Sequence, residues 1–373
     1  MPSAGSKGAD MPNSRIQLAR LANLPANVAT ARALNALYQA KIAYRLRWRR
    51  KYFLWRAMRK SKSLQPVAQR THRITDDMIL GAMVLRNEFQ RLPSVLQHYR
   101  ALGVGHFLIV DNGSTDGSLE LLRAQTDVSL WQTTASYRFS RFGMDWINAL
   151  LRRYGHGHWC LTFDADELFV YPHWHNRPLS ALTDWLERGK IDMFGALMLE
   201  LYPIGRLGGV SPNNAFDPLK VLTHFDGGNY SITYQEKLRA LWVQGGPRAR
   251  SFFADQPRKA PTLNKIPLVK WHKSFAYNSA THSLLPRRLN KAFNDTGAMA
   301  ASGILLHTKF LPQIIEKSHE EKSRGQHFAN SSLYQSYYDS LIKNPTLWTP
   351  YSTRLRSWRQ LQQLGLMSAG GWG

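Results

Sequence analysis

The chain has 373 residues with a formal net charge of +24, and 43% of its residues are hydrophobic. This length and composition suffice for one large α/β domain with additions, and they exclude a chain that is disordered throughout. The single cysteine, Cys160, excludes an intrachain disulfide and suits a reducing compartment.

Residues 1–75 form a basic N-terminal extension. They contain 16 Lys and Arg residues and one acidic residue, Asp10, a net charge of +15 that leaves +9 for the rest of the chain. We expect the first 27 residues to be flexible and residues 28–60 to form an amphipathic helix in which aromatic side chains are interleaved with arginines. Two placements of this helix are open: it lies on an anionic membrane surface, or it packs on the domain with a solvated basic face.

The sequence has no apolar run of the roughly 18 to 20 residues that cross a bilayer, and its N-terminus lacks a signal-peptide pattern. We therefore expect a cytoplasmic protein. If the basic helix contacts lipid, the protein is peripheral on the inner face of the plasma membrane.

Strand and helix patterns alternate over residues 76–310. Apolar runs predict strands at 78–85, 106–110, 128–131, 159–163 and 192–202, and helical spacing predicts helices at 91–102, 118–125 and 143–154. This alternation predicts a Rossmann-type α/β fold with right-handed crossovers, a mixed but mostly parallel sheet and flanking helices. We expect residues 311–373 to add a helical segment that packs on this domain.

The apolar run 159–163 ends in three carboxylates, Asp164, Asp166 and Glu167. Like charges so close together repel one another, so we expect a positive partner beside them. An Asp-x-Asp pair at the end of a strand supplies hard oxygen ligands that suit Mg²⁺ or Mn²⁺, and such an ion bridges phosphate oxygens. The alternative is a solvated turn after the strand.

Polar loops follow two other predicted strands. Asn87 and Glu88 follow the first, and the loop 111–117, with Asp111 and Ser114, follows the second. In a parallel sheet these loops and the acidic cluster open on one crevice, where the ligands of such sheets bind. There a carboxylate can accept hydrogen bonds from a ribose or base, and backbone N–H groups can hold a phosphate. The alternative for the second loop is an ordinary capped turn.

The segments Val110–Gly117 and Phe163–Glu167, in this order, resemble those of glycosyltransferase family 2, whose members are nucleotide-sugar-dependent enzymes of the GT-A fold. Further segments are similar to a bacterial branch of lipopolysaccharide-core and related cell-surface glycan enzymes: Arg86–Glu88, Trp146–Asn148, Gly245–Arg250, Lys265–Trp271 and Leu305–Phe310. The resemblance extends from about Asp77 to Met367. It implies an inverting transfer of a sugar from a nucleoside-diphosphate donor to a hydroxyl of a glycan or lipid-linked acceptor, in cell-envelope polysaccharide synthesis.

The resemblance also implies roles for single residues around the donor. Asp111 matches the carboxylate that recognises the nucleoside, and Asn87 and Glu88 stand where the base is usually met. Asp166 matches the carboxylate that binds the ion directly. Asp164 matches the one that contacts the ribose or a water of the ion.

Three later positions are further candidates for donor and ion contacts. Arg141 is a candidate contact of the diphosphate or sugar, with a surface arginine as the alternative. His307 matches a late histidine that several GT-A enzymes use as a third protein ligand to the ion, with His272 and His282 as weaker alternates. Lys309 is a candidate for neutralising the diphosphate as it leaves.

An inverting transfer also requires a carboxylate that takes the proton of the acceptor hydroxyl. We expect Asp226, on a glycine-containing turn, to be this base, with Glu200 and Glu236 behind it. Arg248 and Arg250 adjoin two glycines and suit a phosphate or an anionic acceptor, and Arg250 is a candidate donor contact.

Two other classes of function fit parts of the sequence. A nucleic-acid-binding protein would explain the arginine and aromatic residues of 44–60, but the common nucleic-acid-binding signatures are missing and the acidic cluster would repel phosphates, so we expect no nucleic acid partner. A metal-dependent phosphohydrolase acting on nucleotide sugars would need a second carboxylate or histidine cluster for a two-metal site, and the sequence shows none.

Overall fold

The computed structural model describes residues 25–209, 217–291, 300–324 and 335–372. The first 24 residues, which we expected to be flexible, lie outside these ranges. The chain divides into two compact units, Met1–Arg45 and Leu46–Gly373. Helix α2 (Pro25–Lys60) begins in the first unit and ends in the second, and the other elements belong to the second unit.

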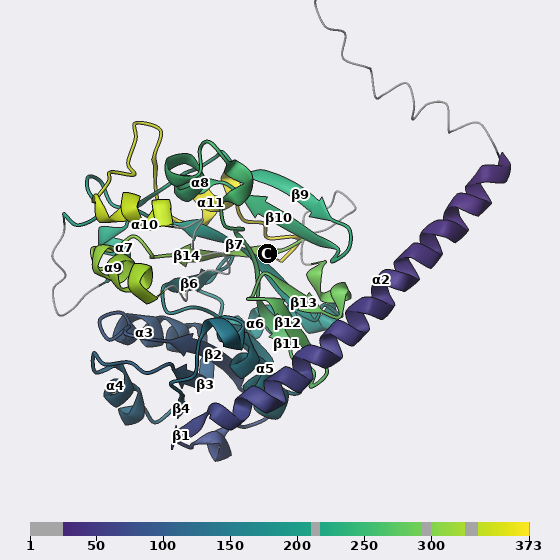
Figure 1. The fold of residues 1–373 in the computed structure, drawn as a ribbon, viewed down its shortest axis with the longest axis horizontal. Coiled ribbons are helices and arrows are strands. Elements are labelled where there is room, and N and C mark those ends of the chain that lie inside the picture. The colour runs from purple at the N-terminus through teal and green to yellow at the C-terminus, as the bar shows by residue number, and fades with distance from the viewer. Residues whose placement is uncertain (1–24, 210–216, 292–299, 325–334, 373) are drawn as a thin grey trace, which may run out of the picture. The chain divides into compact units, whose positions relative to one another are not determined.

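A nine-stranded sheet forms the centre of the second unit in the described part of the chain (Figure 1). From edge to edge its strands are β1 (Gln65–Ala68), β4 (Val128–Gln132), β3 (Val104–Asp111), β2 (Ile79–Leu85), β5 (Trp159–Thr162), β11 (Asn264–Lys270), β7 (Met193–Glu200), β14 (Ser302–His307) and β6 (Glu167–Val170). The pairing sets β4, β3, β2, β5, β7 and β14 in one direction and β1, β11 and β6 in the other. The prediction of an α/β fold with a mixed, mostly parallel sheet is confirmed.

Helices connect strands of the central sheet. The helices of this part are α3 (Leu92–Leu102) between β2 and β3, α4 (Ser118–Ala124) between β3 and β4, α5 (Met144–Tyr154) between β4 and β5, and α6 (Leu179–Arg188) between β6 and β7. Helices α3, α4 and α5 connect successive parallel strands, as the alternating pattern predicts, and α6 connects two strands of opposite direction. In α3 the residues Val95, Leu96 and Tyr99 face the core at helical spacing. The helix ends at Gly103, whose φ of 103° favours glycine.

The central strands are buried on both faces, so their residues alternate between two cores. In β2, Ile79 and Met83 belong to one cluster of buried residues, and Leu80 and Ala82 belong to the other. The first cluster also contains the inner faces of α3 and α6, and the second contains that of α5. The sheet therefore separates two helical layers.

Shorter elements complete the second unit. Three strand pairs lie outside the central sheet: β8 (His224–Phe225) with β15 (Thr353–Arg354), β9 (Ser231–Gln235) with β10 (Ala240–Gln244), and β12 (Ala276–Ser279) with β13 (Ser283–Leu285). The other α-helices in the described ranges are α7 (Pro218–Val221), α8 (Gly246–Phe252), α9 (Ile314–Arg324), α10 (Gln335–Ile342) and α11 (Trp358–Gln363). Single 3₁₀ turns occupy Ser61–Ser63, Thr71–Arg73, Arg138–Ser140, Pro257–Lys259 and Arg287–Asn290.

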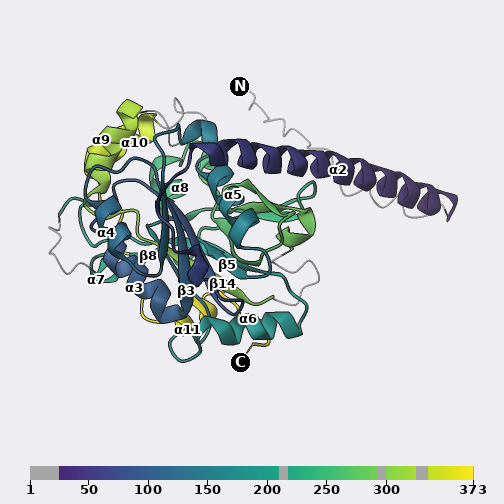
Figure 2. The same cartoon turned by 90° about the horizontal axis from the view of Figure 1, so that it is seen from below.

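The last turns of α2 lie beside the start of α5 (Figures 1 and 2). Leu46, Phe53 and Ala57 are buried, and the Arg56 guanidinium donates to Oδ2 of Asp145 at 2.8 Å. These contacts fit the packed placement of the basic helix, and they leave its opposite face in contact with solvent. No helix among the described residues is both long and apolar enough to span a membrane.

Gly303 marks a close approach between β14 and β6. A Cβ atom at this position would stand 2.7 Å from the carbonyl oxygen of Val170 and 2.8 Å from Cε2 of Phe169. We predict that Gly303→Ala lowers the free energy of unfolding by about 1 to 3 kcal/mol, because neighbouring backbone has to move. Urea unfolding measures the loss, with Gly228→Ala as the control, since a Cβ there meets nothing within 4 Å. Equal stability of the two variants would contradict this packing.

Candidate functional site

A pocket lies at one edge of the central sheet. β2, β3, β5, β7 and β14 end at this edge, and the antiparallel strands β11 and β6 begin there, so segments far apart in the sequence meet. The pocket has a volume of about 300 Å³, at the lower end of the range for small-molecule sites. Residues predicted for the site that line it are Glu88, Asp164, Asp166, Glu167, Arg248, His307 and Lys309, together with His282, the weaker alternate for His307.

Lys265 is the positive partner expected beside the acidic cluster. Leu268 pairs with Leu161, and the same register continued beyond β5 sets Lys265 opposite Asp164. The Lys265 Nζ atom lies 3.0 Å from Oδ2 of Asp164 and also binds Oε1 of Glu167. Burial alone would lower the pKa of Lys265, but the two carboxylates outweigh burial and raise that pKa above its usual value. The Lys265 side chain therefore stays protonated and positively charged at the pocket.

Asp166 and His307 form a second charged pair. The His307 Nε2 atom lies 3.1 Å from Oδ2 of Asp166, and Nδ1 lies 3.5 Å from Oε1 of Glu200, which Arg248 binds. Burial would lower the pKa of His307, but the Asp166 carboxylate outweighs burial and raises it. Burial would likewise raise the pKa of Asp166, but His307 and Arg91 hold it well below its usual value. Each group of the pair therefore favours the charged form of the other.

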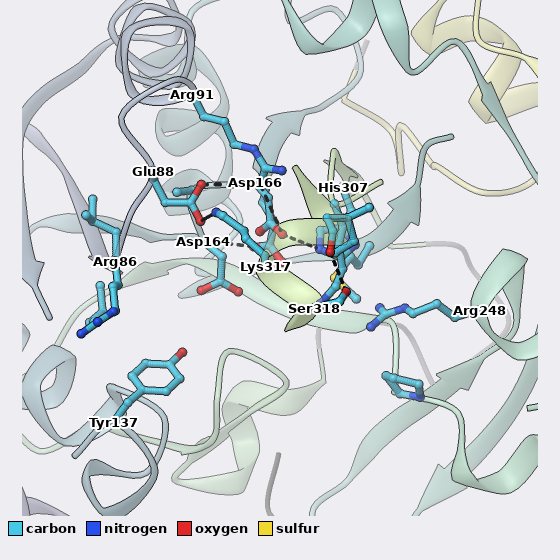
Figure 3. A pocket seen from close by; sticks show the side chains of 18 of the residues that line it. Arg86, Glu88, Arg91, Tyr137, Asp164, Asp166, Arg248, His307, Lys317 and Ser318 are labelled. Carbon is cyan, nitrogen blue, oxygen red and sulfur yellow. Dashed lines mark hydrogen bonds and ion pairs between the residues drawn. The ribbon is translucent and has the colours of Figure 1, made fainter. Parts of the chain in front are cut away.

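Helix α9 supplies part of the pocket wall from the C-terminal end of the chain. Lys317 Nζ lies 2.5 Å from Oε1 of Glu88 (Figure 3). Arg91, directly before α3, lies 3.7 Å from Glu88 and 3.9 Å from Asp166. Cations from two distant segments thus surround the carboxylates that line the pocket.

Several pocket residues were missed in the sequence. They are Arg91, Tyr137, Lys265 and Lys317. Lys265 carried a usable signal, because a charged residue near the start of an otherwise apolar strand needs a partner. Lys317 carried none, because it lies on a polar helix where no local pattern separates it from Lys322.

Asn87, Asp111 and Ser114 join two rim loops and do not line the pocket. The Asp111 Oδ2 atom accepts from the backbone N–H groups of Gly113 and Ser114, each at 3.0 Å. Ser114 Oγ accepts from the Asn87 N–H, and Asn87 Oδ1 accepts from the Thr115 N–H, both at 2.9 Å. Asp111 is fully buried, and its Oδ1 atom has no hydrogen-bond partner among the described residues. This oxygen is buried away from the pocket, so in the structure no ligand reaches it.

Arg141 lies outside the pocket lining. Its guanidinium stands 3.6 Å from the centroid of the Phe53 ring, and Nη2 donates to the carbonyl oxygens of Tyr277 and Asn278 at 3.0 and 2.6 Å. Burial lowers its pKa to about 10, although Asp145 acts in the opposite direction. These contacts make Arg141 a brace between α2 and the β12–β13 pair.

Asp226 and Arg250 also lie outside the lining and bind each other. Arg250 Nε lies 3.0 Å from Oδ2 of Asp226, and Nη2 lies 3.1 Å from Oδ1. Tyr202 Oη donates to the same Oδ1 at 2.5 Å. Both oxygens of the Asp226 carboxylate are therefore engaged. Neither the predicted base, Asp226, nor the predicted donor contact, Arg250, lines the pocket. Glu200, the first alternative, adjoins the pocket through His307.

The described residues contain no group of three or more His, Cys, Asp or Glu side chains arranged to hold a metal ion. Asp166 and His307 nevertheless present an oxygen and a nitrogen 3.1 Å apart. Glu200 adjoins the other ring nitrogen, as outer carboxylates do at histidines that bind metals. At phosphate sites Mg²⁺ takes one or two carboxylates and completes its coordination with water and phosphate oxygens. The donor set therefore fits an ion that arrives with a phosphate ligand.

Comparison with known proteins does not identify a family. No protein-family model matches the sequence, and no curated protein is significantly similar to it. The resemblance to glycosyltransferase family 2 therefore rests on the motifs and on what their residues can do.

We predict opposite pH trends for two histidines, His307 and His98. The raised pKa of His307 contributes stability that is present below about pH 6.5 and is lost as the pH rises through the folded-state pKa. The difference in unfolding free energy between the parent and His307→Gln therefore shrinks as the pH rises above about 6.5. His98 has a pKa lowered to about 4 by burial, so the difference between the parent and His98→Gln falls as the pH falls below about 6.5.

Urea unfolding at several pH values, in buffer containing EDTA, measures both histidine trends. His98 serves as the control because it is partly buried and lies outside the pocket lining. Parallel slopes for the two variants would show that His307 is not charged by Asp166.

Proposed function

We propose that the protein is a metal-dependent glycosyltransferase with a GT-A-like fold. It would move a sugar from a nucleoside-diphosphate donor to a hydroxyl of a glycan or lipid-linked acceptor in cell-envelope polysaccharide synthesis. This is the reaction that the resemblance to glycosyltransferase family 2 implies. The observation that carries the proposal is the meeting of Asp166 and His307, 141 positions apart, in one pocket at the sheet edge. The family resemblance implies that both side chains bind one ion. They can do so only if they lie close together, as they do here.

The two ends of the pocket differ in chemistry. Arg86 and Tyr137 lie on one side of the acidic cluster, and Arg248 lies on the other (Figure 3). A guanidinium plane and a phenol ring suit the faces of a nucleobase. Pro261 and Thr262 also line the pocket. We assign the nucleoside to the first end, the diphosphate to the middle and the reacting sugar to the second end.

Cations around the middle of the pocket match the charge that a diphosphate develops as it leaves. Lys309, Lys317 and Arg91 line this region. In the proposal Asp166 and His307 hold a Mn²⁺ or Mg²⁺ ion, which when bound adds positive charge at the phosphate oxygens. Lys317 would exchange its contact with Glu88 for the phosphate. Because the chain supplies this stabilisation electrostatically, no covalent intermediate with the protein is required.

The proposal does not keep Asp226 as the base. Its pairing with Arg250, outside the pocket lining, leaves the acceptor proton to a carboxylate that lines the pocket. Asp164 suits this step, because its side chain is 53% exposed and Lys265 holds its Oδ2 atom.

Asp166→Asn tests the proposed ion site. We predict that Mn²⁺ together with a sugar nucleotide raises the unfolding free energy of the parent by about 2.7 kcal/mol at 100 times the Kd. The variant loses most of this gain, because the amide oxygen carries no charge for the ion. Thermal-shift titrations with a panel of sugar nucleotides, with and without Mn²⁺, measure the gain. Asp192→Asn, at an exposed carboxylate outside the pocket, is the control.

Analysis of the products formed from the same sugar nucleotides separates transfer from its enzymatic rival. Cleavage of the diphosphate by water, which yields a nucleoside monophosphate and a sugar phosphate and is unchanged by glycan acceptors, would favour the phosphohydrolase. Failure of every sugar nucleotide to stabilise the parent in the presence of Mn²⁺ would overturn the donor site itself.

Lys317 and Lys322 offer a matched comparison on helix α9. We predict that Lys317→Met weakens sugar-nucleotide binding by roughly tenfold, because one charge-assisted contact with the diphosphate is lost. Lys322→Met leaves the affinity unchanged, since Lys322 pairs with Asp339 and does not line the pocket. Isothermal titration calorimetry measures both affinities. Equal effects of the two changes would mean that general electrostatics, and no specific contact, attracts the donor.

A further inference from the structure

The C-terminal part of α2 is strongly basic. Residues 46–60 contain seven Lys and Arg residues and no Asp or Glu. Side chains three or four residues apart share one face of a helix, so its two faces can be separated by their exposure. Leu46, Phe53 and Ala57 form the buried face.

The opposite face of this helix carries large apolar side chains in contact with solvent. Trp48 is 53% exposed, Tyr52 50%, and Trp55 and Met58 are each 47% exposed. Tyr52 and Trp55 stack with ring centroids 5.9 Å apart. A stripe of this kind costs hydration free energy unless something covers it.

Basic groups lie directly on this stripe. Lys51 Nζ stands 4.5 Å from the centroid of the Trp48 ring, and the Arg59 guanidinium stands 5.0 Å from that of Trp55. On this exposed face of α2, cationic groups therefore lie directly beside aromatic rings. Amphipathic tryptophan and tyrosine rings with adjacent cations are typical of helices that lie in the headgroup region of a bilayer.

The loop next to this helix extends the same surface toward the pocket. The Arg56 Nη2 atom donates to the carbonyl oxygen of Phe139 at 2.8 Å, and the Phe139 side chain is 72% exposed. Two residues earlier, Tyr137 lines the pocket. A surface that covers Phe139 and α2 would therefore adjoin the predicted nucleoside end of the pocket.

We propose that residues 47–59 of α2, together with Phe139, form a docking surface for a bilayer that contains anionic phospholipid. The positive charge matches the lipid headgroups, and the apolar side chains would enter the boundary with the acyl chains. A nucleic acid would satisfy the arginines but would leave Met58 and Phe139 in water. A second copy of the same helix would bring like charges together. The anionic bilayer is the one occupant that satisfies both components of the face.

Vesicle flotation with the full chain tests this docking surface. We expect binding to vesicles of phosphatidylcholine with phosphatidylglycerol, and little binding to phosphatidylcholine alone. Trp48→Ala with Trp55→Ala lowers the partition coefficient by roughly tenfold, and so does Lys51→Gln with Arg59→Gln, in the second case by removing the attraction to anionic lipid. The control is Ile204→Ala with Tyr351→Ala, two exposed hydrophobic residues outside α2, and it binds as the parent does.

Three results would overturn this inference. The first is equal vesicle binding by the parent and both α2 variants at unchanged melting temperatures. The second is a parent that binds duplex DNA or RNA but no vesicles, and the third is a parent dimer that the tryptophan variant converts to a monomer. The inference goes beyond the proposed function, and vesicle binding requires no sugar nucleotide. Its failure is therefore distinguishable from failure of the donor site.

Discussion

The pocket end of the central sheet, where β5 and β14 end, depends on the buried ammonium group of Lys265. Asp164, Asp166 and Glu167 stand within four residues, and without compensation they would repel one another and give up their charges. Lys265 offsets two of these carboxylates and His307 offsets the third. Removal of one partner from a buried ion pair costs on the order of 3 to 5 kcal/mol, so the shape of this edge and its charge pattern are maintained together.

The mixed direction of the strands explains why opposite charges meet there. Parallel strands end at the pocket and deliver Asp164, Glu200 and His307 close to their carboxyl ends. A sheet of parallel strands alone would bring only strand ends to this edge. β11 runs the other way and therefore delivers Lys265 from near its start, in a register that sets it opposite the acidic cluster. Helix α9 then adds Lys317 from outside the sheet.

The parts of this structure that sequence reasoning could predict are those fixed by local patterns. The first parallel strands and helices were predicted because strands buried on both faces give continuous apolar runs, and α3 has helical spacing that stops at Gly103. The positions of Asp166 and His307 at the edge followed because each stands at or just after a strand end. The position of Asp226 outside the pocket lining could not be predicted, because only the tertiary fold reveals its pairing with Arg250. Lys317 was invisible for the same reason, since its partner Glu88 lies 229 residues away.

If Asp166 and His307 hold an ion, as we propose, their contact also sets a condition on its binding. A histidine binds a metal only through a ring nitrogen that has lost its proton, and Asp166 raises the pKa of His307 and so favours the proton. The proton and a divalent ion therefore compete for the same nitrogen and for the same carboxylate. A phosphate ligand shifts this competition, because its negative charge attracts an ion of charge two more strongly than a proton of charge one. In the proposal, the resting pair would thus keep the pocket neutralised until donor and ion arrive together.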